Sequence, residues 1–219
     1  MTARSKFPGA EAFLPKRRTL KTLREASKGC KGCDLYIPAT QTVFGEGPSS
    51  ARVVFVGEQP GNSEDLEGRP FVGPAGGIFD RALQAAGVDR NQVYVTNAVK
   101  HFSFEPRGKA RLHKRPKPGE VRACAPWLKA ELELIQPDVL VLLGSTAAQS
   151  IFGPSFRITS ERGKKLDSEL APFVIATIHP SAVLRAPNAD AREESFQSLV
   201  NDLKIVAKEL RRKPPTAAE

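Results

Sequence analysis

Four short runs of apolar, mostly β-branched residues constrain the fold of this chain more than any other feature. They occupy residues 52–57, 93–97, 139–144 and 173–177, and each ends at a glycine or a polar residue, as buried strands do. Between them, apolar residues at three- and four-residue spacing predict helices near residues 75–87, 119–135, 145–152 and 191–211. This alternation predicts the α/β class: an α/β/α sandwich with a central, mainly parallel four-stranded sheet.

The length and composition predict a single domain. The chain has 219 residues, and no Gly/Ser-rich linker or internal repeat divides it. We expect the domain to cover residues 18–212, with flexible ends at 1–17 and 213–219, where proline, alanine and charged residues are frequent. There is no apolar run of about 18 residues and no apolar signal-peptide core. We therefore expect a soluble, cytoplasmic protein with no membrane partner, and nothing in the sequence requires more than a monomer.

Positive charge is concentrated in one segment. The formal net charge is +9, and residues 100–122 hold eight basic residues against two acidic ones. Within this stretch, residues 102–118 leave the second predicted strand as an irregular insertion, long enough to suggest a function of its own. Such a segment favours a polyanionic partner, and from charge alone a solvated loop without a partner is an equal alternative.

Residues suited to base recognition follow the predicted strands. Ligands of parallel sheets gather beyond the carboxyl ends of the strands, and Glu58, Asn97 and His179 all lie there. Asn97 offers both a hydrogen-bond donor and an acceptor, which could pair with the polar edge of a base. Phe71, between glycines, offers a ring on which a base could stack. The structural alternatives are a core phenylalanine and a turn asparagine.

His113 lies in the cationic stretch Lys109-Ala110-Arg111-Leu112-His113-Lys114-Arg115. With an ordinary pKa of about 6.5, its imidazole is mostly neutral at pH 7 and has a lone pair available for attack. The lysines and arginines around it are suited to binding phosphate. The sequence therefore offers two interpretations for His113, as a nucleophile or as a phosphate contact.

The three cysteines indicate a metal or cluster site. Cys30 and Cys33 form a C-x2-C pair, and Cys124 is the third. This spacing suits metal or cluster ligands, and a cytosolic setting disfavours a disulfide.

Four motifs together resemble the uracil-DNA glycosylase superfamily over roughly residues 20–205. They are Gly57-Glu58-Gln59-Pro60-Gly61, Gly68-Arg69-Pro70-Phe71-Val72-Gly73, Thr96-Asn97-Ala98-Val99-Lys100 and His179-Pro180-Ser181-Ala182. The chain is most similar to the iron-sulfur family-four enzymes and, among their relatives, to the covalent UdgX-like proteins. The resemblance implies a substrate of uracil-containing DNA, single-stranded and also double-stranded, and free uracil as a product. It implies that Gln59, Phe71, Asn97 and His179 bind uracil, with His179 stabilising negative charge on the departing base.

Two departures from the commoner family-four pattern are similar to UdgX-like proteins. Gln59 replaces an alanine, and the basic insertion carries a Lys-x-Arg-x-His loop whose histidine, in UdgX-like proteins, bonds to the deoxyribose. In this chain Ala110 replaces one arginine of that loop. The hypothesis is that Glu58 orients His113 and takes up its proton while the imidazole attacks C1′, giving one turnover and a stable adduct. The alternatives are a conventional turnover glycosylase, in which water attacks, and a non-catalytic iron-sulfur DNA-binding protein.

The resemblance also implies ligands for DNA and for a cofactor. The expected DNA contacts are Lys109, Arg111, Lys114, Arg115, Ser181 and Arg185. Family-four relatives hold a 4Fe-4S cluster on four cysteines, and the position of one of them is His101 here. We expect a structural cluster ligated by Cys30, Cys33, Cys124 and His101. A three-cysteine cluster with an open iron, or a zinc ion on the same four residues, are the alternatives.

Overall fold

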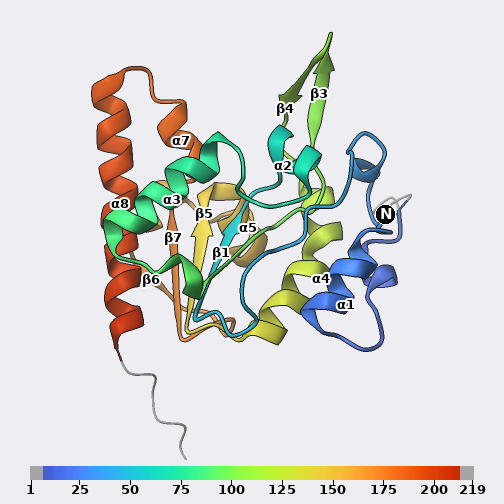
Figure 1. Cartoon of the computed structure of the whole chain (residues 1–219), viewed down its shortest axis with the longest axis horizontal. Helices are drawn as coiled ribbons and strands as arrows, with labels where there is room; N and C mark the ends of the chain where they lie inside the picture. The colour runs from blue at the N-terminus through green and yellow to red at the C-terminus, as the bar shows by residue number, and fades with distance from the viewer. Residues whose placement is uncertain (1–6, 213–219) are drawn as a thin grey trace, which may run out of the picture.

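The computed structural model describes residues 7–212, which form a three-layered α/β domain (Figure 1). Its sheet has the order β2-β1-β5-β7-β6. The four predicted strands are β1 (Val53–Gly57), β2 (Val93–Asn97), β5 (Val139–Leu143) and β7 (Phe173–Thr177), and they are mutually parallel. The α/β class is thus confirmed. The expected count of four strands is wrong, because the two-residue strand β6 (Lys165–Leu166) adds an antiparallel edge that is too short to give a periodic signal.

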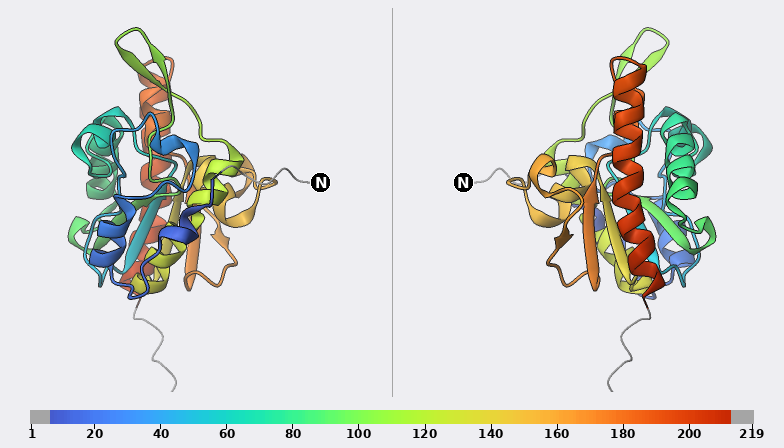
Figure 2. Two further views of the ribbon diagram at one scale, coloured as in Figure 1. Left: turned by 90° about the vertical axis from the view of Figure 1, so that its right-hand side faces the viewer. Right: turned by 90° about the vertical axis from the view of Figure 1, so that its left-hand side faces the viewer.

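Every position of the four long strands is buried, because helices cover both faces of the sheet. Alternate residues, such as Phe55, pack with α3 (Pro74–Ala86) and α8 (Ala189–Arg211) on one face. The residues between them, such as Val54, pack with α4 (Pro118–Ile135) and α5 (Gly144–Phe152) on the other. These four helices occupy the predicted segments, and the layers are visible edge-on in Figure 2.

The amino-terminal segment forms a third small core against α4. Helix α1 (Leu20–Ser27) buries Leu23 beside Trp127, and the 3-10 helix η1 (Ala10–Phe13) buries Ala10 in the same cluster. Within the expected flexible segment 1–17, Ala10 is buried in this core, and Phe13 and Leu14 pack partly against it. Residues 1–6 and the expected carboxyl-terminal tail, 213–219, lie outside the described residues.

The basic insertion is a β-hairpin instead of the irregular connection that the sequence predicts. Strands β3 (Phe104–Arg107) and β4 (Ala110–His113) pair antiparallel, and Phe104 lies opposite His113. Gly108 adopts a φ of 58° in the two-residue turn, a conformation that glycine accepts without strain. The strands are short and mostly exposed, so they lack the alternation that reveals a half-buried strand. In both views of Figure 2 the hairpin projects beyond the layers.

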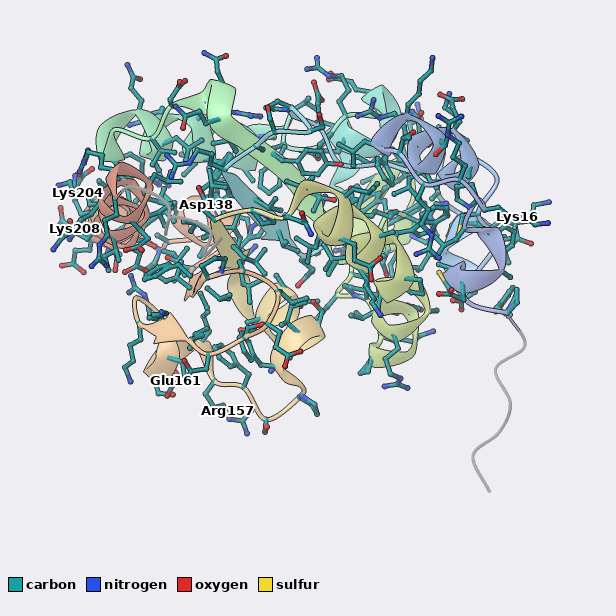
Figure 3. The ribbon with its side chains drawn as sticks, turned by 90° about the horizontal axis from the view of Figure 1, so that it is seen from below. Lys16, Asp138, Arg157, Glu161, Lys204 and Lys208 are labelled. Atoms are coloured by element: carbon teal, nitrogen blue, oxygen red, sulfur yellow. The ribbon has the colours of Figure 1, made fainter. Side chains whose placement is uncertain are left out.

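Short elements complete the chain between these layers. They are η2 (Asp34–Tyr36), α2 (Asn62–Glu67), η3 (Arg90–Gln92), α6 (Ile158–Glu161) and α7 (Ser181–Leu184). Figure 3 views the end of the molecule opposite the hairpin, where charged side chains such as Lys204 and Lys208 of α8 point outward. Within residues 7–212, no helix combines the length and the apolarity that crossing a bilayer requires.

Candidate active site

The loops that leave the parallel strands converge around two adjoining cavities. One, of about 460 Å³, is lined by Phe71 and Asn97, and the other, of about 420 Å³, by Glu58 and Thr146. Five residues line both cavities: Gln59, His113, His179, Ser181 and Arg185. The predicted pocket residues, which are up to 121 positions apart in the sequence (58 to 179), are therefore brought together at the carboxyl edge of the sheet.

Gly57 leaves room for Asn97 and Phe71 at the wall of the 460 Å³ cavity. A Cβ atom at this last residue of β1 would lie 2.3 Å from Oδ1 of Asn97 and 3.0 Å from the ring of Phe71. Asn97 pairs with Gly57 across the β1–β2 register. Any side chain at Gly57 would therefore displace the amide and the ring from the cavity.

Phe71 is held in a conformation that its residue type rarely adopts. Its φ is 57°, which places a non-glycine residue in the left-handed region. The ring contacts Phe79 at a centroid distance of 5.1 Å and lies nearly parallel to His179 at 6.2 Å. Its carbonyl occupies space beside Gly76, where a Cβ atom would approach it to 1.8 Å. Such local strain is typical of functional sites, and here it aims an aromatic ring into the cavity.

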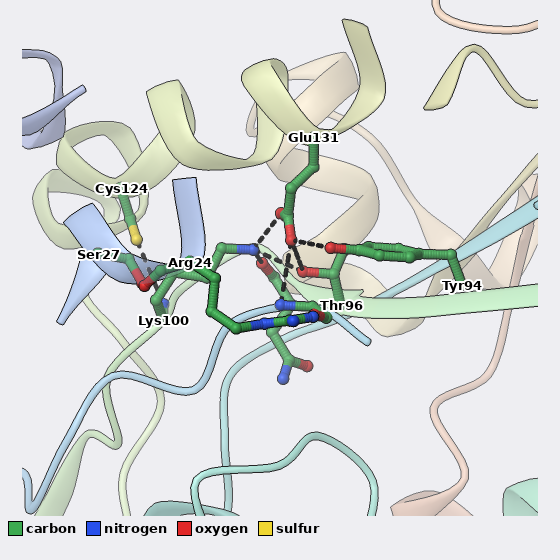
Figure 4. A network of polar contacts seen from close by, with 9 residues as sticks. Arg24, Ser27, Tyr94, Thr96, Lys100, Cys124 and Glu131 are labelled. Carbon is green, nitrogen blue, oxygen red and sulfur yellow. Dashed lines mark hydrogen bonds and ion pairs between the residues drawn. The ribbon is translucent and has the colours of Figure 1, made fainter. Parts of the chain in front are cut away.

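Asn97 is only 3% exposed, and a buried lysine holds its backbone. Its carbonyl accepts a hydrogen bond of 2.9 Å from Nζ of Lys100, which also contacts Glu131 at 2.5 Å (Figure 4). Glu131 in turn accepts hydrogen bonds from Tyr94 and Thr96. The side-chain amide of Asn97 takes part in none of the hydrogen bonds among residues 7–212, so its donor and acceptor are available to a ligand.

The hydrogen bonds of His179 fix its tautomer. The backbone N–H of Ser181 donates to Nδ1 at 3.1 Å, so Nδ1 carries no proton and the neutral ring carries it on Nε2. The Ser181 hydroxyl lies 2.7 Å from the same nitrogen and accepts from Arg185 at 2.9 Å. Burial, with the charges of Arg185 and His113, lowers the pKa of His179 to about 4. At neutral pH this residue is therefore an uncharged N–H donor.

Gln59 fastens both ends of the hairpin segment and contacts His113. Its Oε1 accepts from the N–H of Ser103, while its Nε2 donates to the carbonyls of Ser103 and Lys114, each at 3.1 Å. The same Nε2 lies 2.9 Å from Nε2 of His113. A carboxylate oxygen of Glu58 is 3.5 Å from that imidazole nitrogen. The side chain of His113 is 52% exposed, so its ring stands at the mouth of both cavities.

Thr146 is a site residue that the sequence interpretation missed. Its hydroxyl donates a short hydrogen bond to Oε2 of Glu58 and accepts one of 3.0 Å from Arg115. Arg115 also donates to Gln149 at 2.8 Å. The available signal was positional: Thr146 follows the third predicted strand, the only one of the four for which no candidate residue was named.

Arg111, which the sequence predicts as a DNA contact, also binds within the protein. Its guanidinium donates to fully buried Asp65 at 2.6 Å and to Asn62 at 2.7 Å. It also lies over the rings of Phe102 and Phe104. These contacts fasten the hairpin to the segment around α2 and leave 20% of the side chain exposed. Arg111 is therefore an anchor for the loop that carries His113.

The other expected DNA contacts lie on exposed surface. Lys109 occupies the hairpin turn, and Lys114 forms an ion pair with Glu105. Arg115 and Arg185 line the cavities with exposed side chains, and Ser181 begins α7 beside His179.

Comparison with known proteins identifies the family. The family profile described as the uracil DNA glycosylase superfamily matches residues 44–204, which include the loops of both cavities. The chain belongs to this superfamily.

Individual relatives of this superfamily member cover most of its length. It is 37% identical over 191 residues to a type-4 uracil-DNA glycosylase of Thermotoga maritima, an alignment covering 87% of this chain and 96% of the relative. Type-4 uracil-DNA glycosylases of Sulfurisphaera tokodaii and Archaeoglobus fulgidus are 37% and 39% identical, and cover 87% and 80% of this chain. The alignments cover 87% of each of these two relatives.

The three cysteines of this uracil-DNA glycosylase superfamily member lie buried in one core cluster with Trp127. Each sulfur has an N–H donor: Trp127 to Cys30 at 3.3 Å, the backbone of Lys100 to Cys124 at 3.2 Å, and the backbone of Leu35 to Cys33. Hydrogen bonds of this kind favour negative charge on sulfur and are typical of cluster ligands. Burial raises the pKa of Cys33 to about 11 and that of Cys124 to about 12, so a bound cation is needed to keep these groups ionised.

A single-ion site is not formed in this superfamily member. Within residues 7–212, no three histidine, cysteine or carboxylate side chains converge as the ligands of one metal ion do. The same absence applies to the expected cluster ligands as to the zinc alternative. His101 is buried, which lowers its pKa to about 4, and its charged neighbour is Asp65. Among residues 7–212, no hydrogen bond or ion pair joins His101 to the cysteines.

Proposed function

We propose that this protein is a uracil-DNA glycosylase whose His113 captures the deoxyribose after the base departs. The observation that carries the proposal is the position of His113 Nε2, 3.5 Å from a Glu58 oxygen at the junction of the two cavities. The imidazole thus borders both the cavity lined by Phe71 and Asn97 and the cavity lined by Glu58. The relatives named type-4 uracil-DNA glycosylases support the excision part of the proposal.

Uracil is held, in this proposal, between Phe71 and the amide of Asn97. The ring of Phe71 stacks on the extruded base, a contact worth about 1 to 3 kcal/mol per base. The Asn97 amide donates to O4 and accepts from N3–H. Lys100 holds the backbone carbonyl of Asn97, so the position from which the side-chain amide extends is fixed. The amide N–H that donates to O4 of uracil would face the amino group of cytosine, which is also a donor. Gln59 borders the same cavity and supports its wall.

His179 stabilises the leaving group. The bond from C1′ to N1 of uracil breaks, and its electron pair departs with the base as an anion. The Nε2–H of His179 donates to a uracil oxygen and so lowers the energy of that anion in the transition state. Because Ser181 holds Nδ1 as an acceptor, the donor proton is always on the nitrogen that is not engaged by Ser181. The anion then takes a proton from water and leaves as free uracil.

His113 supplies the capturing electron pair from Nε2. Where the imidazole is protonated, Glu58 accepts the Nε2 proton and frees that pair. The pair forms the new bond to C1′ as the sugar cation develops, and the proton that remains on Nδ1 stays on the resulting imidazolium or passes to solvent. The Glu58 carboxylate stabilises the cation before and after bond formation, while Thr146 holds its other oxygen. One adduct forms per protein molecule.

A conventional turnover glycosylase is the second candidate. The identity of about 37% to type-4 enzymes over most of the chain favours it, since these relatives are named for the glycosylase and not for an adduct. In that case water attacks C1′ and the hairpin only binds DNA. A non-catalytic DNA-binding protein is less well supported, because Asn97 and Glu58 line two adjoining cavities and His179 lines both.

We also propose a 4Fe-4S cluster on Cys30, Cys33 and Cys124, with His101 as the fourth ligand. The N–H donors to all three sulfurs support the cysteine ligands, and the family-four resemblance supports the cluster type. The cluster would supply a structural link between the segment that packs on α4 and the root of the hairpin. Among the exposed residues, Lys109, Lys114, Arg115 and Arg185 with Ser181 would contact the DNA backbone.

The test is incubation with a labelled single-stranded oligonucleotide that contains one deoxyuridine, followed by a denaturing gel. We expect a band shifted by one protein mass, absent with a thymidine control. His113→Ala should lose the shifted band and release uracil repeatedly, because water can occupy the vacated position. A wild-type protein that leaves alkali-labile free DNA would refute capture and establish turnover. An intact strand would refute both.

A further inference from the structure

A third cavity lies along α4 and α5, beside the cavity that Glu58 and Thr146 line. It has a volume of about 570 Å³ and lies between the first turns of α4, one side of α5 and the residues that follow α5. Arg115 and Thr146 line both this cavity and the one that Glu58 lines, so the two cavities adjoin at these side chains. Its other walls include Pro116, Pro118, Arg122, Gln149, Ile151 and Pro154. We call this cavity the α4–α5 groove.

The chemistry of the α4–α5 groove is apolar with a cationic rim. Of the described residues that line it, only Arg115 and Arg122 are charged, and both are basic. Arg122 is exposed and takes part in no hydrogen bond or ion pair within residues 7–212. Arg115 uses Nε for Thr146 and one Nη for Gln149, which leaves further N–H donors free. The cationic rim complements a phosphate, and the proline and isoleucine walls complement the flat face of a base.

We infer that the single-stranded DNA flanking the target nucleotide runs through the α4–α5 groove on one side. Single-strand sites combine a positive groove along the backbone with apolar surfaces on which bases lie. Here the groove shares Thr146 with the cavity that Glu58 lines, where the sugar of the target nucleotide would sit. The neighbouring phosphate would reach Arg115 and the next one Arg122. The inference rests on the proposed function, because its occupant is the strand whose uracil enters the site.

Photo-crosslinking locates the flanking strand without requiring catalysis. Two single-stranded probes each carry one deoxyuridine and one 4-thiothymidine, placed two nucleotides to the 5′ side in one probe and to the 3′ side in the other. After irradiation of the wild-type protein, peptides joined to DNA are identified by mass spectrometry. We expect one of the two probes to crosslink within residues 115–125 or 146–154. The inference would be overturned if both probes crosslink only outside these two ranges. It would also be overturned if the only crosslinks within them come from an added complementary strand.

A matched pair of arginine variants measures the contribution of the groove. Arg122→Ala should lower the excision rate at subsaturating protein about tenfold, the factor expected for one lost charge-assisted hydrogen bond, and should leave the rate at saturation unchanged. The dependence of log rate on log salt should become shallower by about 0.7, the contribution of one single-strand phosphate. Arg122→Lys should recover the salt slope. Arg211→Ala removes an exposed arginine at the far end of α8 and serves as the control.

The outcomes separate the inference from the proposed function. Equal rates and salt slopes for Arg122→Ala and Arg211→Ala would overturn the groove assignment while excision by the wild type stands. If the wild type releases no uracil but a flank still crosslinks within the groove, the proposed chemistry fails and the DNA-binding assignment remains. A loss of saturating rate with Arg122→Ala would also contradict the inference, because it would place Arg122 at the reacting atoms.

Discussion

The buried ion pair between Lys100 and Glu131 supports the pocket from behind, and its removal is the most quantitative test of the structure. The side chains are 1% and 0% exposed and lie 2.5 Å apart. Lys100 also donates to Thr96 at 2.6 Å and to the carbonyl of Asn97 at 2.9 Å. Replacing Lys100 by methionine keeps the approximate volume and removes the charge. Glu131 is then left as a buried carboxylate without a cation.

Removing one partner of a buried ion pair costs about 3 to 5 kcal/mol. The lower end applies here, because Glu131 still accepts hydrogen bonds from Tyr94 at 2.8 Å, Thr96 at 3.0 Å and the backbone of Gly45 at 3.1 Å. We expect Lys100→Met to lose about 3 kcal/mol of unfolding free energy. For a chain of this size, that corresponds to a fall in Tm of about 6 to 12 °C.

The double variant Lys100→Met with Glu131→Gln separates charge burial from packing. It leaves no buried charge, and the glutamine oxygen can still accept from Tyr94 and Thr96, so the double variant should be more stable than Lys100→Met alone. Urea unfolding of the wild type, both single variants and the double variant gives the coupling energy. A loss below about 1 kcal/mol for Lys100→Met, or a double variant no more stable than that single variant, would refute the assignment of this pair as a buried charge interaction.

Two further predictions concern the hairpin and His179. Arg111→Ala should slow adduct formation by at least about tenfold, since the hairpin loses a charge-assisted bond to buried Asp65. Single-turnover gels measure this against Arg107→Ala, an exposed arginine of the same hairpin, and equal rates for the two would contradict the anchoring role. The pKa of His179 is lowered to about 4 in the folded state, so the unfolded state binds the proton more strongly. Its stabilising contribution is therefore complete above about pH 6.5 and is lost as the pH falls toward 4. The fall in unfolding free energy from pH 7 to pH 5 should be smaller for His179→Gln than for the wild type. Equal falls for the two proteins would show that the ring is not buried in its neutral form.

The main elements could be predicted from local pattern, because a sheet that is buried on both faces requires continuous apolar strands. The runs at β1, β2, β5 and β7 are continuous and apolar, and the helices between them repeat at helical spacing. The edge strand β6 and the hairpin could not be predicted in the same way. Both are short and largely exposed, and their pairing is set by the segments they meet.

The residues of the candidate site were likewise only partly predictable from the sequence. Glu58, Asn97 and His179 were identifiable because they follow predicted strands, and the carboxyl ends of parallel strands meet at one edge. Thr146 also follows a strand, but a threonine at this position does not by itself predict a hydrogen bond to Glu58. The anchoring role of Arg111 was hidden because its partner, Asp65, is 46 positions away.

By itself, the sequence determined the fold class, the helices and strands of the core, and the residues that border the pocket. It did so because periodicity records which faces are buried, and because topology then places the strand ends together. Only the tertiary structure decided which of those side chains touch. Gln59 fastens the hairpin at Ser103 and Lys114, and this brings His113 to Glu58. Such contacts depend on where loops meet in space, which no local spacing records.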